Sequence, residues 1–171
     1  MSTGPTIKRG VSKQDYRTPT AFLEAVSTRF GPIDCDLACE EHNKVAPIGV
    51  TKSKHDSLLY PWDLCLGNCW LNPPFNRIQP WAEKCFGWHS LNTRIFLLVP
   101  ASVGSNWFAN WVHQKSLVLF LSPRLKFVGA DDPYPKDLML CCFGVGRVGY
   151  ECWRWNTDNK IEAPPPLRRI F

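Results

Sequence analysis

Apolar residues along this chain recur either at the spacing of one helical face or in short unbroken runs. A first helix is predicted to begin at Pro19, because proline suits the first helical position and Thr18 can serve as its N-cap. Gly31 is expected to end this helix. Its apolar face comprises Phe22, Ala25, Val26 and Phe30.

Two further helices are predicted at residues 80–90 and 105–114, where apolar residues lie three and four positions apart. The runs at residues 94–99 and 116–121 are almost continuously apolar, which is typical of strands buried on both faces of a sheet. Shorter strands are expected at residues 33–37, 45–50, 69–71, 138–145 and 150–155.

The alternation of strands and helices predicts an α/β fold, in which helices cover both faces of a mostly parallel sheet. A tight connection at residues 146–149 joins the last two strands, which predicts an antiparallel hairpin at one edge of the sheet. A chain of 171 residues is ordinary for a single domain. We expect a flexible arm at residues 1–15, one domain at residues 16–158 and a proline-rich basic tail at residues 159–171.

The composition suits a globular protein, with 44% hydrophobic and 20% charged residues. The longest apolar runs are too short to span a bilayer, and the first residues lack the apolar stretch of a secretory signal. We therefore expect a cytoplasmic protein with no membrane partner. The net charge of +5 suits an anionic partner without requiring one.

Eight cysteines raise the question of a metal site. Cys35 and Cys39 are four positions apart, as are Cys65 and Cys69, and neither pair has the closer Cys-x-x-Cys spacing of a zinc ribbon. Several cysteines fall in apolar, strand-like runs, where a free thiol acts as a small hydrophobic side chain. We expect reduced, structural cysteines and no metal.

The segment Asn72-Pro73-Pro74-Phe75 directly follows the strand predicted at residues 69–71, and open α/β sheets bind ligands beyond the carboxyl ends of their strands. The Asn72 side-chain oxygen and the Pro73 carbonyl can accept both hydrogens of one –NH₂ group, which favours a tetrahedral nitrogen with its lone pair aimed at an electrophile. The prolines stiffen the turn, and Phe75 can stack on a planar substrate. The alternative is a plain Pro-Pro turn capped by Asn72.

Several short motifs follow one another from about Tyr16 onward: Tyr16-Arg17-Thr18-Pro19, Ile33-Asp34-Cys35-Asp36-Leu37-Ala38, Asn43, Asp56-Ser57-Leu58, Trp62, Asn72-Pro73-Pro74-Phe75, Trp81, Leu97-Leu98-Val99-Pro100 and Arg124-Leu125-Lys126-Phe127. In order and spacing, this series resembles the phage DNA N-6-adenine methyltransferase (Dam) family. The resemblance implies a Rossmann-like fold that uses S-adenosylmethionine to methylate the N6 amino group of adenine in double-stranded DNA.

The resemblance also implies roles for matching residues. Residues 72–75 match the catalytic tetrapeptide, and residues 18–19 resemble a cofactor-binding element of amino-methyltransferases. Residues 56–58 resemble an Asp-x-Leu motif whose carboxylate accepts from the adenine amino group of the cofactor, and residues 36–38 resemble the acidic end of the first cofactor strand. A glycine-rich loop common after that strand is missing here. The expected cofactor residues are Thr18, Pro19, Asp34, Asp36, Ala38, Asp56, Leu58 and Asn72.

A base inside a duplex cannot reach such a site, so the target adenine has to be flipped out of the stack. Arg77, Arg124 and Lys126 are candidate contacts to the DNA backbone, and the alternative for each is an ordinary solvated charge. The loop at residues 122–136 is the candidate for sequence recognition, because a chain of this length has no room for a large recognition domain.

Two other functions compete with DNA adenine methylation. One is methylation of RNA or of a protein glutamine, since a similar Asn-Pro-Pro-aromatic motif serves those substrates too. The other is a non-catalytic nucleic-acid-binding protein. The tetrapeptide, the Thr-Pro element and the Asp-x-Leu motif are all intact, which favours an active enzyme over a methyltransferase fold that has lost its activity.

Overall fold

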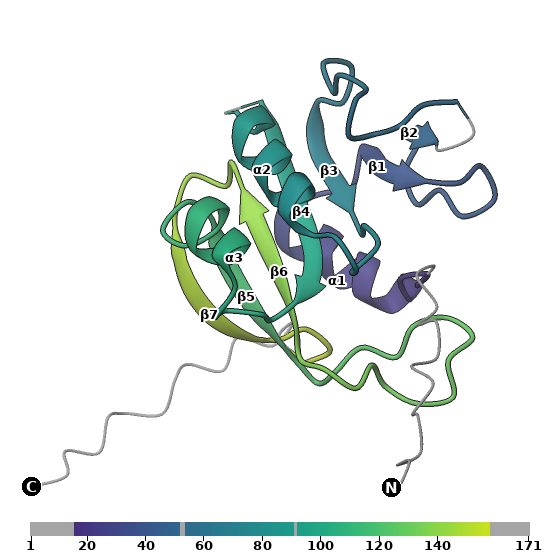
Figure 1. Cartoon of the computed structure of the whole chain (residues 1–171). Helices are drawn as coiled ribbons and strands as arrows, with labels where there is room; N and C mark the ends of the chain where they lie inside the picture. Colours follow the sequence, from purple (N-terminus) through teal and green to yellow (C-terminus); the bar gives the residue numbers. More distant parts are fainter. Residues whose placement is uncertain (1–15, 52–53, 91, 158–171) are drawn as a thin grey trace, which may run out of the picture.

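The computed structural model describes residues 16–51, 54–90 and 92–157, which form three helices and a seven-stranded sheet (Figure 1). The expected arm at residues 1–15 and tail at residues 159–171 lie outside the described residues. The helices are α1 (Thr20–Phe30), α2 (Gln79–Trp88) and α3 (Asn106–Trp111). The strands are β1 (Cys35–Cys39), β2 (Ile48–Thr51), β3 (Gly67–Leu71), β4 (Thr93–Pro100), β5 (Leu117–Ser122), β6 (Leu138–Phe143) and β7 (Gly149–Arg154).

The strand order is β2-β1-β3-β4-β6-β5-β7. Strands β2, β1, β3 and β4 pair in parallel, and β7 is parallel to β5. Only β6 runs the other way, between β4 and β5. The expectation of an α/β fold with a mostly parallel sheet is confirmed.

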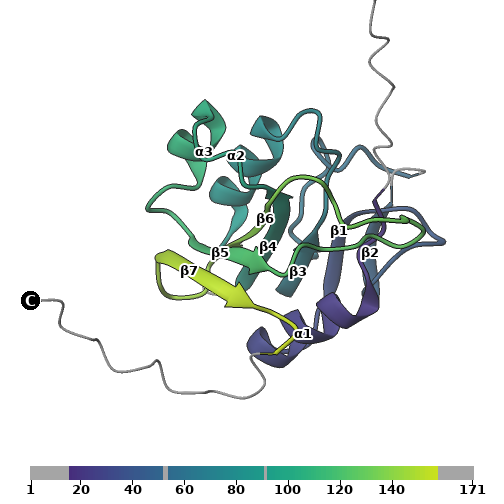
Figure 2. The same cartoon turned by 90° about the horizontal axis from the view of Figure 1, so that it is seen from below.

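The expected antiparallel hairpin at the sheet edge is wrong, because β7 pairs with β5 instead of β6. The reason lies in burial. Every residue of β6 is buried and most of β5 is too, whereas β7 is mostly exposed or half-buried. Placing β6 between β4 and β5 gives both apolar strands a neighbour on each side, and the half-exposed β7 then takes the edge (Figure 2).

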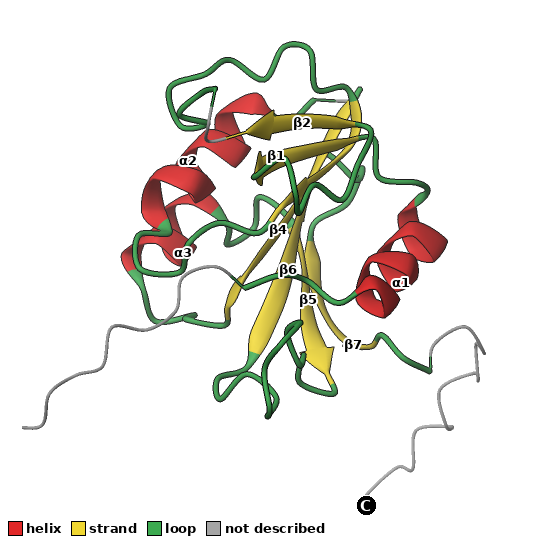
Figure 3. Ribbon diagram, turned by 90° about the vertical axis from the view of Figure 1, so that its right-hand side faces the viewer, coloured by secondary structure: helices red, strands yellow, loops and turns green. Residues whose placement is uncertain are grey.

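Helices lie on both faces of the sheet, with α1 on one face and with α2 and α3 on the other (Figure 3). Successive side chains of a strand point to opposite faces, so each central strand contributes to two cores. In β4, Ile95, Leu97 and Val99 pack on the α2 and α3 side, while Phe96 and Leu98 pack on the α1 side. The two cores hold the sheet rigid between its helical layers.

The helices begin and end close to their predicted positions, but the N-cap of α1 is not Thr18. Pro19 is the N-cap residue, and no side chain caps the helix. The Thr18 hydroxyl accepts instead from the side chain of Asn72. Gly31 ends the helix as predicted, with φ of 97° and its N–H donated to the Ser27 carbonyl.

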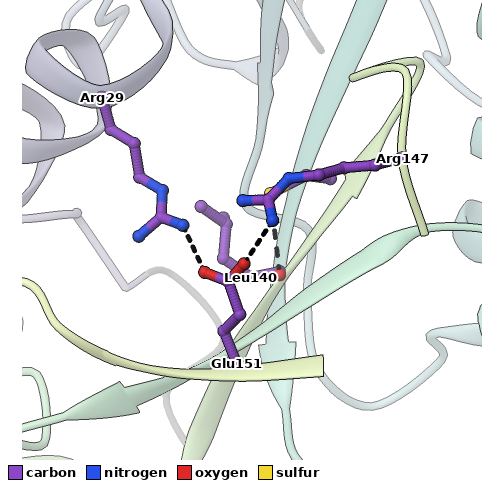
Figure 4. Close-up of polar contacts among 5 residues, drawn as sticks. Arg29, Leu140, Arg147 and Glu151 are labelled. Atoms are coloured by element: carbon purple, nitrogen blue, oxygen red, sulfur yellow. Dashed lines mark hydrogen bonds and ion pairs between the residues drawn. The ribbon is translucent and has the colours of Figure 1, made fainter. Parts of the chain in front are cut away.

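Two arginines tie the edge strand β7 to the rest of the molecule through Glu151 (Figure 4). Arg29, in the last turn of α1, lies 2.5 Å from one carboxylate oxygen, and Arg147 lies 2.6 Å from the other. Burial opposes the ionisation of Glu151, but the hydrogen bonds and charges of the two arginines outweigh it and hold the pKa of this carboxyl below its usual value. The edge strand is thereby fastened to α1.

Cys35 and Cys65 form a disulfide, so the expectation of reduced cysteines is wrong for this pair. Their Cα atoms lie 5.6 Å apart, because the turn before β3 brings Cys65 to the start of β1 across 30 positions of sequence. The other six cysteines are free, and all but Cys152 are buried. Burial raises the pKa of Cys39 and Cys69 to about 12, which keeps these thiols protonated and unreactive at neutral pH.

Within the part of the chain that the structure describes, no group of histidine, cysteine or acidic side chains is arranged to hold a metal ion. Among the same residues, none of the helices has the length and apolar character that crossing a bilayer requires.

Candidate active site

A cavity of about 700 Å³ opens beside the carboxyl ends of β1 and β3, between α1 and the loop after β1. This volume is within the range of small-molecule and cofactor sites, and the position matches the ligand-binding edge of open α/β sheets. Five of the residues expected to act in catalysis or cofactor binding line it: Thr18, Asp36, Ala38, Asn72 and Pro74.

Asn72 is held by the chain segment that precedes α1. Its side-chain nitrogen Nδ2 donates to the Tyr16 carbonyl at 2.5 Å and to the Thr18 hydroxyl at 3.2 Å. Both partners are acceptors towards this nitrogen, so the hydrogen-bond network assigns the orientation of the amide. The oxygen Oδ1 is thus left as the acceptor for a ligand, as the chemistry proposed for this tetrapeptide requires.

Phe75 belongs to an aromatic cluster of four residues, Tyr16, Phe75, Phe127 and Tyr134. The ring of Phe75 is stacked on Tyr16 at a centroid distance of 5.7 Å and an interplanar angle of 24°. Tyr134 meets Phe75 edge-on at 5.6 Å, and Phe127 is tilted at 6.3 Å. The cluster joins the tetrapeptide to the segment before α1 and to the loop between β5 and β6.

Asp36 is nearly buried, with 4% of its surface exposed, and it binds its own loop. One carboxylate oxygen accepts from the Ala38 N–H at 3.3 Å and the other from the Val45 N–H at 3.2 Å. Burial raises the pKa of this carboxyl despite both hydrogen bonds. Asn43 fastens the same loop by accepting from the Glu40 N–H at 2.7 Å. Side chains therefore shape the loop that stands where a glycine-rich loop is common.

Asp34 directly precedes β1 and does not line the cavity, although its neighbours Pro32 and Ile33 do. Its carboxylate accepts from the Asn68 N–H at 2.8 Å, and it lies against Gly67, where a Cβ atom would come within 2.2 Å of the carboxylate. Gly67 has φ of +77°, so the glycine is needed for both space and backbone conformation. Asp34 links the starts of β1 and β3, which places it away from the residues around Asn72.

Asp56 and Leu58 line a second hollow, also of about 700 Å³, together with Arg77 and Lys84. One oxygen of Asp56 accepts from the Leu58 N–H at 3.0 Å, which stabilises the turn at residues 56–60. The expected cofactor residues are therefore divided between two hollows. A link between them runs through Ser57, whose hydroxyl donates to the carbonyl of Leu37 in β1.

Two residues near the candidate site were not predicted from the sequence. Lys84 lines the second hollow, and Tyr134 belongs to the aromatic cluster around Phe75. Lys84 contacts the turn at residues 56–60, and burial lowers the pKa of its ammonium group while the charge of Asp56 acts in the opposite direction. Burial, followed by the charge of Tyr16, raises the pKa of Tyr134. Neither residue is part of a recognisable motif, so the sequence holds no local signal for either.

The three basic candidates are exposed but differ in their contacts. Arg124 donates to the Asp137 carboxylate at 2.9 Å and to the Pro135 carbonyl at 3.2 Å, so it closes the base of the loop between β5 and β6. The same loop is bound to the segment before α1 by the Val128 N–H, which donates to the Arg17 carbonyl at 3.0 Å.

Comparison with known proteins gives two matches. The family model for DNA N-6-adenine-methyltransferase (Dam) matches residues 6–139. The DNA N-6-adenine-methyltransferase of Escherichia phage T1 is 30% identical over 110 residues, which are 64% of this chain and 45% of the relative. The chain thus spans less than half the length of this curated relative. No solved structure matches the chain.

Proposed function

The chain belongs to the DNA N-6-adenine-methyltransferase (Dam) family, and from this premise we propose that it transfers a methyl group from S-adenosylmethionine to the N6 amino group of adenine in double-stranded DNA. The observation that carries the proposal is the orientation of Asn72 at the end of β3. Its Nδ2 is bound to Tyr16 and Thr18, which leaves Oδ1 for the substrate.

In this proposal, Asn72 Oδ1 and the Pro73 carbonyl accept the two hydrogens of the adenine amino group. The nitrogen lone pair, otherwise delocalised into the ring, is then directed at the methyl carbon. When the bond between N6 and the methyl carbon forms, the electron pair of the former sulfur–carbon bond would leave with the neutral thioether that S-adenosylmethionine becomes. The extra proton on N6 then leaves to solvent. Positioning and electrostatics carry this reaction, because the sulfonium supplies an activated methyl group when bound.

The cavity beside Asn72 fits the cofactor in size and in chemistry. S-adenosylmethionine has polar ends and flat or apolar parts, and the lining combines Thr18, Asp36 and Asn72 with Ala38 and Pro74. The loop at residues 38–45 and the start of α1 would hold the cofactor, with Pro19 fixing the entry of the chain into the helix. This arrangement supports a Rossmann-like methyltransferase fold for the sheet.

Asp56 and Leu58 would bind the adenine end of the cofactor from the second hollow. This role requires the two hollows to act together, and the hydrogen bond from Ser57 to Leu37 supports it by fixing the turn on β1 between Asp36 and Ala38. Asp34 has no part in this proposal, because its carboxylate is used between β1 and β3.

The aromatic cluster supports a planar substrate next to Asn72. A flipped adenine would stack on Phe75, with Tyr16, Phe127 and Tyr134 forming the rest of an aromatic wall. Tyr16 is stacked on Phe75, so we propose that the base displaces or slides past the Tyr16 ring. Arg77 and Lys126 would contact the DNA backbone, and Arg124 would act by shaping the loop that reads the sequence.

Nucleoside mass spectrometry tests the proposal, on unmethylated DNA incubated with the purified protein and S-adenosylmethionine. N6-methyladenine should form with the parent protein and with Asn110→Ala, a matched exposed asparagine in α3, and should be absent with Asn72→Ala. Modified RNA or protein glutamine in place of modified DNA would move the assignment to those substrates. Absence of cofactor binding in the folded parent would favour a non-catalytic DNA-binding protein.

A further inference from the structure

We propose that Lys84 is a positioning residue, which acts on cofactor binding by holding the turn at residues 56–60 against the end of β1. The inference rests on the proposed function, because it assigns the effect to the cofactor turn that carries Asp56. Lys84 lies on α2, the helix that begins just after the tetrapeptide at residues 72–75.

The ammonium group of Lys84 is committed to the backbone of this turn. Its nitrogen Nζ donates to the carbonyls of Ser57 at 2.7 Å, Leu58 at 3.1 Å and Tyr60 at 2.5 Å. An ammonium group has three protons, so these bonds use its full capacity. The side chain therefore has little left to offer a ligand directly, and its contribution has to pass through the turn.

Two tryptophan rings enclose the same group. Lys84 Nζ lies 4.4 Å from the ring centroid of Trp62 and 5.4 Å from that of Trp88, distances at which a cation is attracted to an aromatic ring. Trp62 is 1% exposed and donates its indole N–H to the Ser57 hydroxyl at 3.0 Å. That hydroxyl donates in turn to Leu37 of β1.

These contacts connect the two hollows. Lys84 fixes the carbonyl side of the turn, and Ser57 fixes the turn to β1 at the strand position between Asp36 and Ala38. Asp56 stands at the start of the turn, where its own carbonyl accepts from the N–H groups of residues 59 and 60. Loosening Lys84 would therefore free Asp56 to move relative to the cavity beside Asn72.

The test compares Lys84→Met, Lys84→Arg and Lys115→Met. Methionine keeps the apolar stem between the tryptophans but donates no hydrogen bond, and arginine keeps the charge. Lys115 is the matched control, because its ammonium lies 5.7 Å from the ring of Phe86 and it is not among the residues that bind the turn. Amide hydrogen exchange of residues 58–60 is measured without cofactor, and binding and turnover are measured with S-adenosylmethionine.

In Lys84→Met we expect about tenfold faster exchange at residues 58–60, and a dissociation constant and KM for S-adenosylmethionine raised about tenfold. The kcat at saturating cofactor should stay near that of the parent. Lys84→Arg should restore part of the affinity, and Lys115→Met should match the parent. A purely structural role would instead lower the folded fraction and kcat without changing the KM of the folded enzyme.

Parent-like exchange and cofactor affinity in folded Lys84→Met overturn the inference while leaving the proposed function intact. If Lys84→Met does not fold, Lys84→Gln decides, because glutamine has no charge and one donor fewer than lysine, so unchanged exchange and affinity there would overturn the inference as well. A parent that binds no S-adenosylmethionine would overturn the proposed function, and with it the link from the turn to the cofactor. Faster exchange in Lys84→Met would then still show that Lys84 holds the turn.

Discussion

The side-chain nitrogen of Asn72 donates to the hydroxyl of Thr18 across 3.2 Å. Thr18, which its local sequence suggests as the N-cap of α1, therefore helps to orient Asn72, the residue proposed to bind the substrate amino group. Because Thr18 is one residue before the N-cap, it has no helix N–H to satisfy, and its hydroxyl is available to the tetrapeptide. Helix α1 and the end of β3 are joined at this point.

Thr18→Val should lower kcat about tenfold, because Asn72 loses one of the acceptors that fix its amide and the side chain can rotate. Thr18→Ser keeps the hydroxyl and should stay near the parent value. Initial rates of DNA methylation at saturating substrates measure the effect. Melting temperatures should change little, since no cap is lost, and a large fall in the melting temperature of Thr18→Val with unchanged kcat would contradict this role.

Asp36→Asn should weaken the binding of S-adenosylmethionine, because it removes one carboxylate oxygen from the pair that holds the N–H groups of Ala38 and Val45. Isothermal titration of the folded variant measures this affinity. Asp34→Asn is the comparison, and it should leave affinity unchanged, since Asp34 does not line the cavity and its carboxylate accepts from the Asn68 N–H. If the parent and Asp36→Asn bind S-adenosylmethionine with equal affinity, Asp36 does not hold the loop in its cofactor-binding conformation.

The raised pKa of Asp36 also predicts that the free energy of unfolding depends on pH. Burial raises its folded pKa above the usual 3.8, so protonation is favoured in the folded protein. This contribution to the free energy of unfolding is present below the unfolded pKa and is lost as pH rises through the folded pKa. The stability of the parent relative to Asp36→Asn should therefore fall between acidic and neutral pH, measured by urea unfolding. A relative stability that rises with pH would mean that the two hydrogen bonds outweigh burial.

Phe75→Leu should raise the KM for DNA and lower kcat, because leucine keeps apolar volume but removes the flat ring next to Asn72. Phe120→Leu is the control, since Phe120 lies on β5 and stacks on Tyr150 outside the cluster. Steady-state kinetics at fixed cofactor concentration separate the two variants. Similar losses in both would point to general destabilisation instead of substrate stacking.

In Lys126→Gln, the logarithm of the DNA association constant should fall less steeply with the logarithm of the salt concentration. The magnitude of the slope should decrease by about 0.9, the value for one lost phosphate contact. Lys126 is exposed and lies two positions after Arg124, near the start of the loop between β5 and β6 that is proposed to read the sequence. DNA binding measured between low and moderate salt gives the slope. Lys115→Gln, on the α3 side of the sheet, is the control and should retain the parent slope. An unchanged slope in Lys126→Gln would show that Lys126 carries an ordinary solvated charge and does not contact a phosphate.

The sequence could predict most of the elements and where the tetrapeptide lies, because these depend on local patterns. Buried runs mark the central strands, and the tetrapeptide follows β3 at the edge where open α/β sheets bind ligands. The position of β6 between β4 and β5 could not be predicted in this way. It depends on which buried strands require a neighbouring strand on each side, and this is a property of the whole sheet. Asp34 and Asp36 differ by two positions and look alike in sequence, yet only Asp36 reaches the cavity. The Asp34 carboxylate binds the start of β3 through the Asn68 N–H, whereas the Asp36 carboxylate binds the loop after β1.

The loop at residues 123–137 starts and ends on two interior strands that lie side by side, β5 and β6. Its ends are therefore fixed by the sheet, and its middle is free of any duty in strand pairing. Lengthening such a connection costs little chain entropy, about 0.6 kcal/mol for each doubling. If this loop reads the target sequence as proposed, segments inserted at residues 129–133 would change the target while Phe127 and Tyr134 keep their contacts with Phe75.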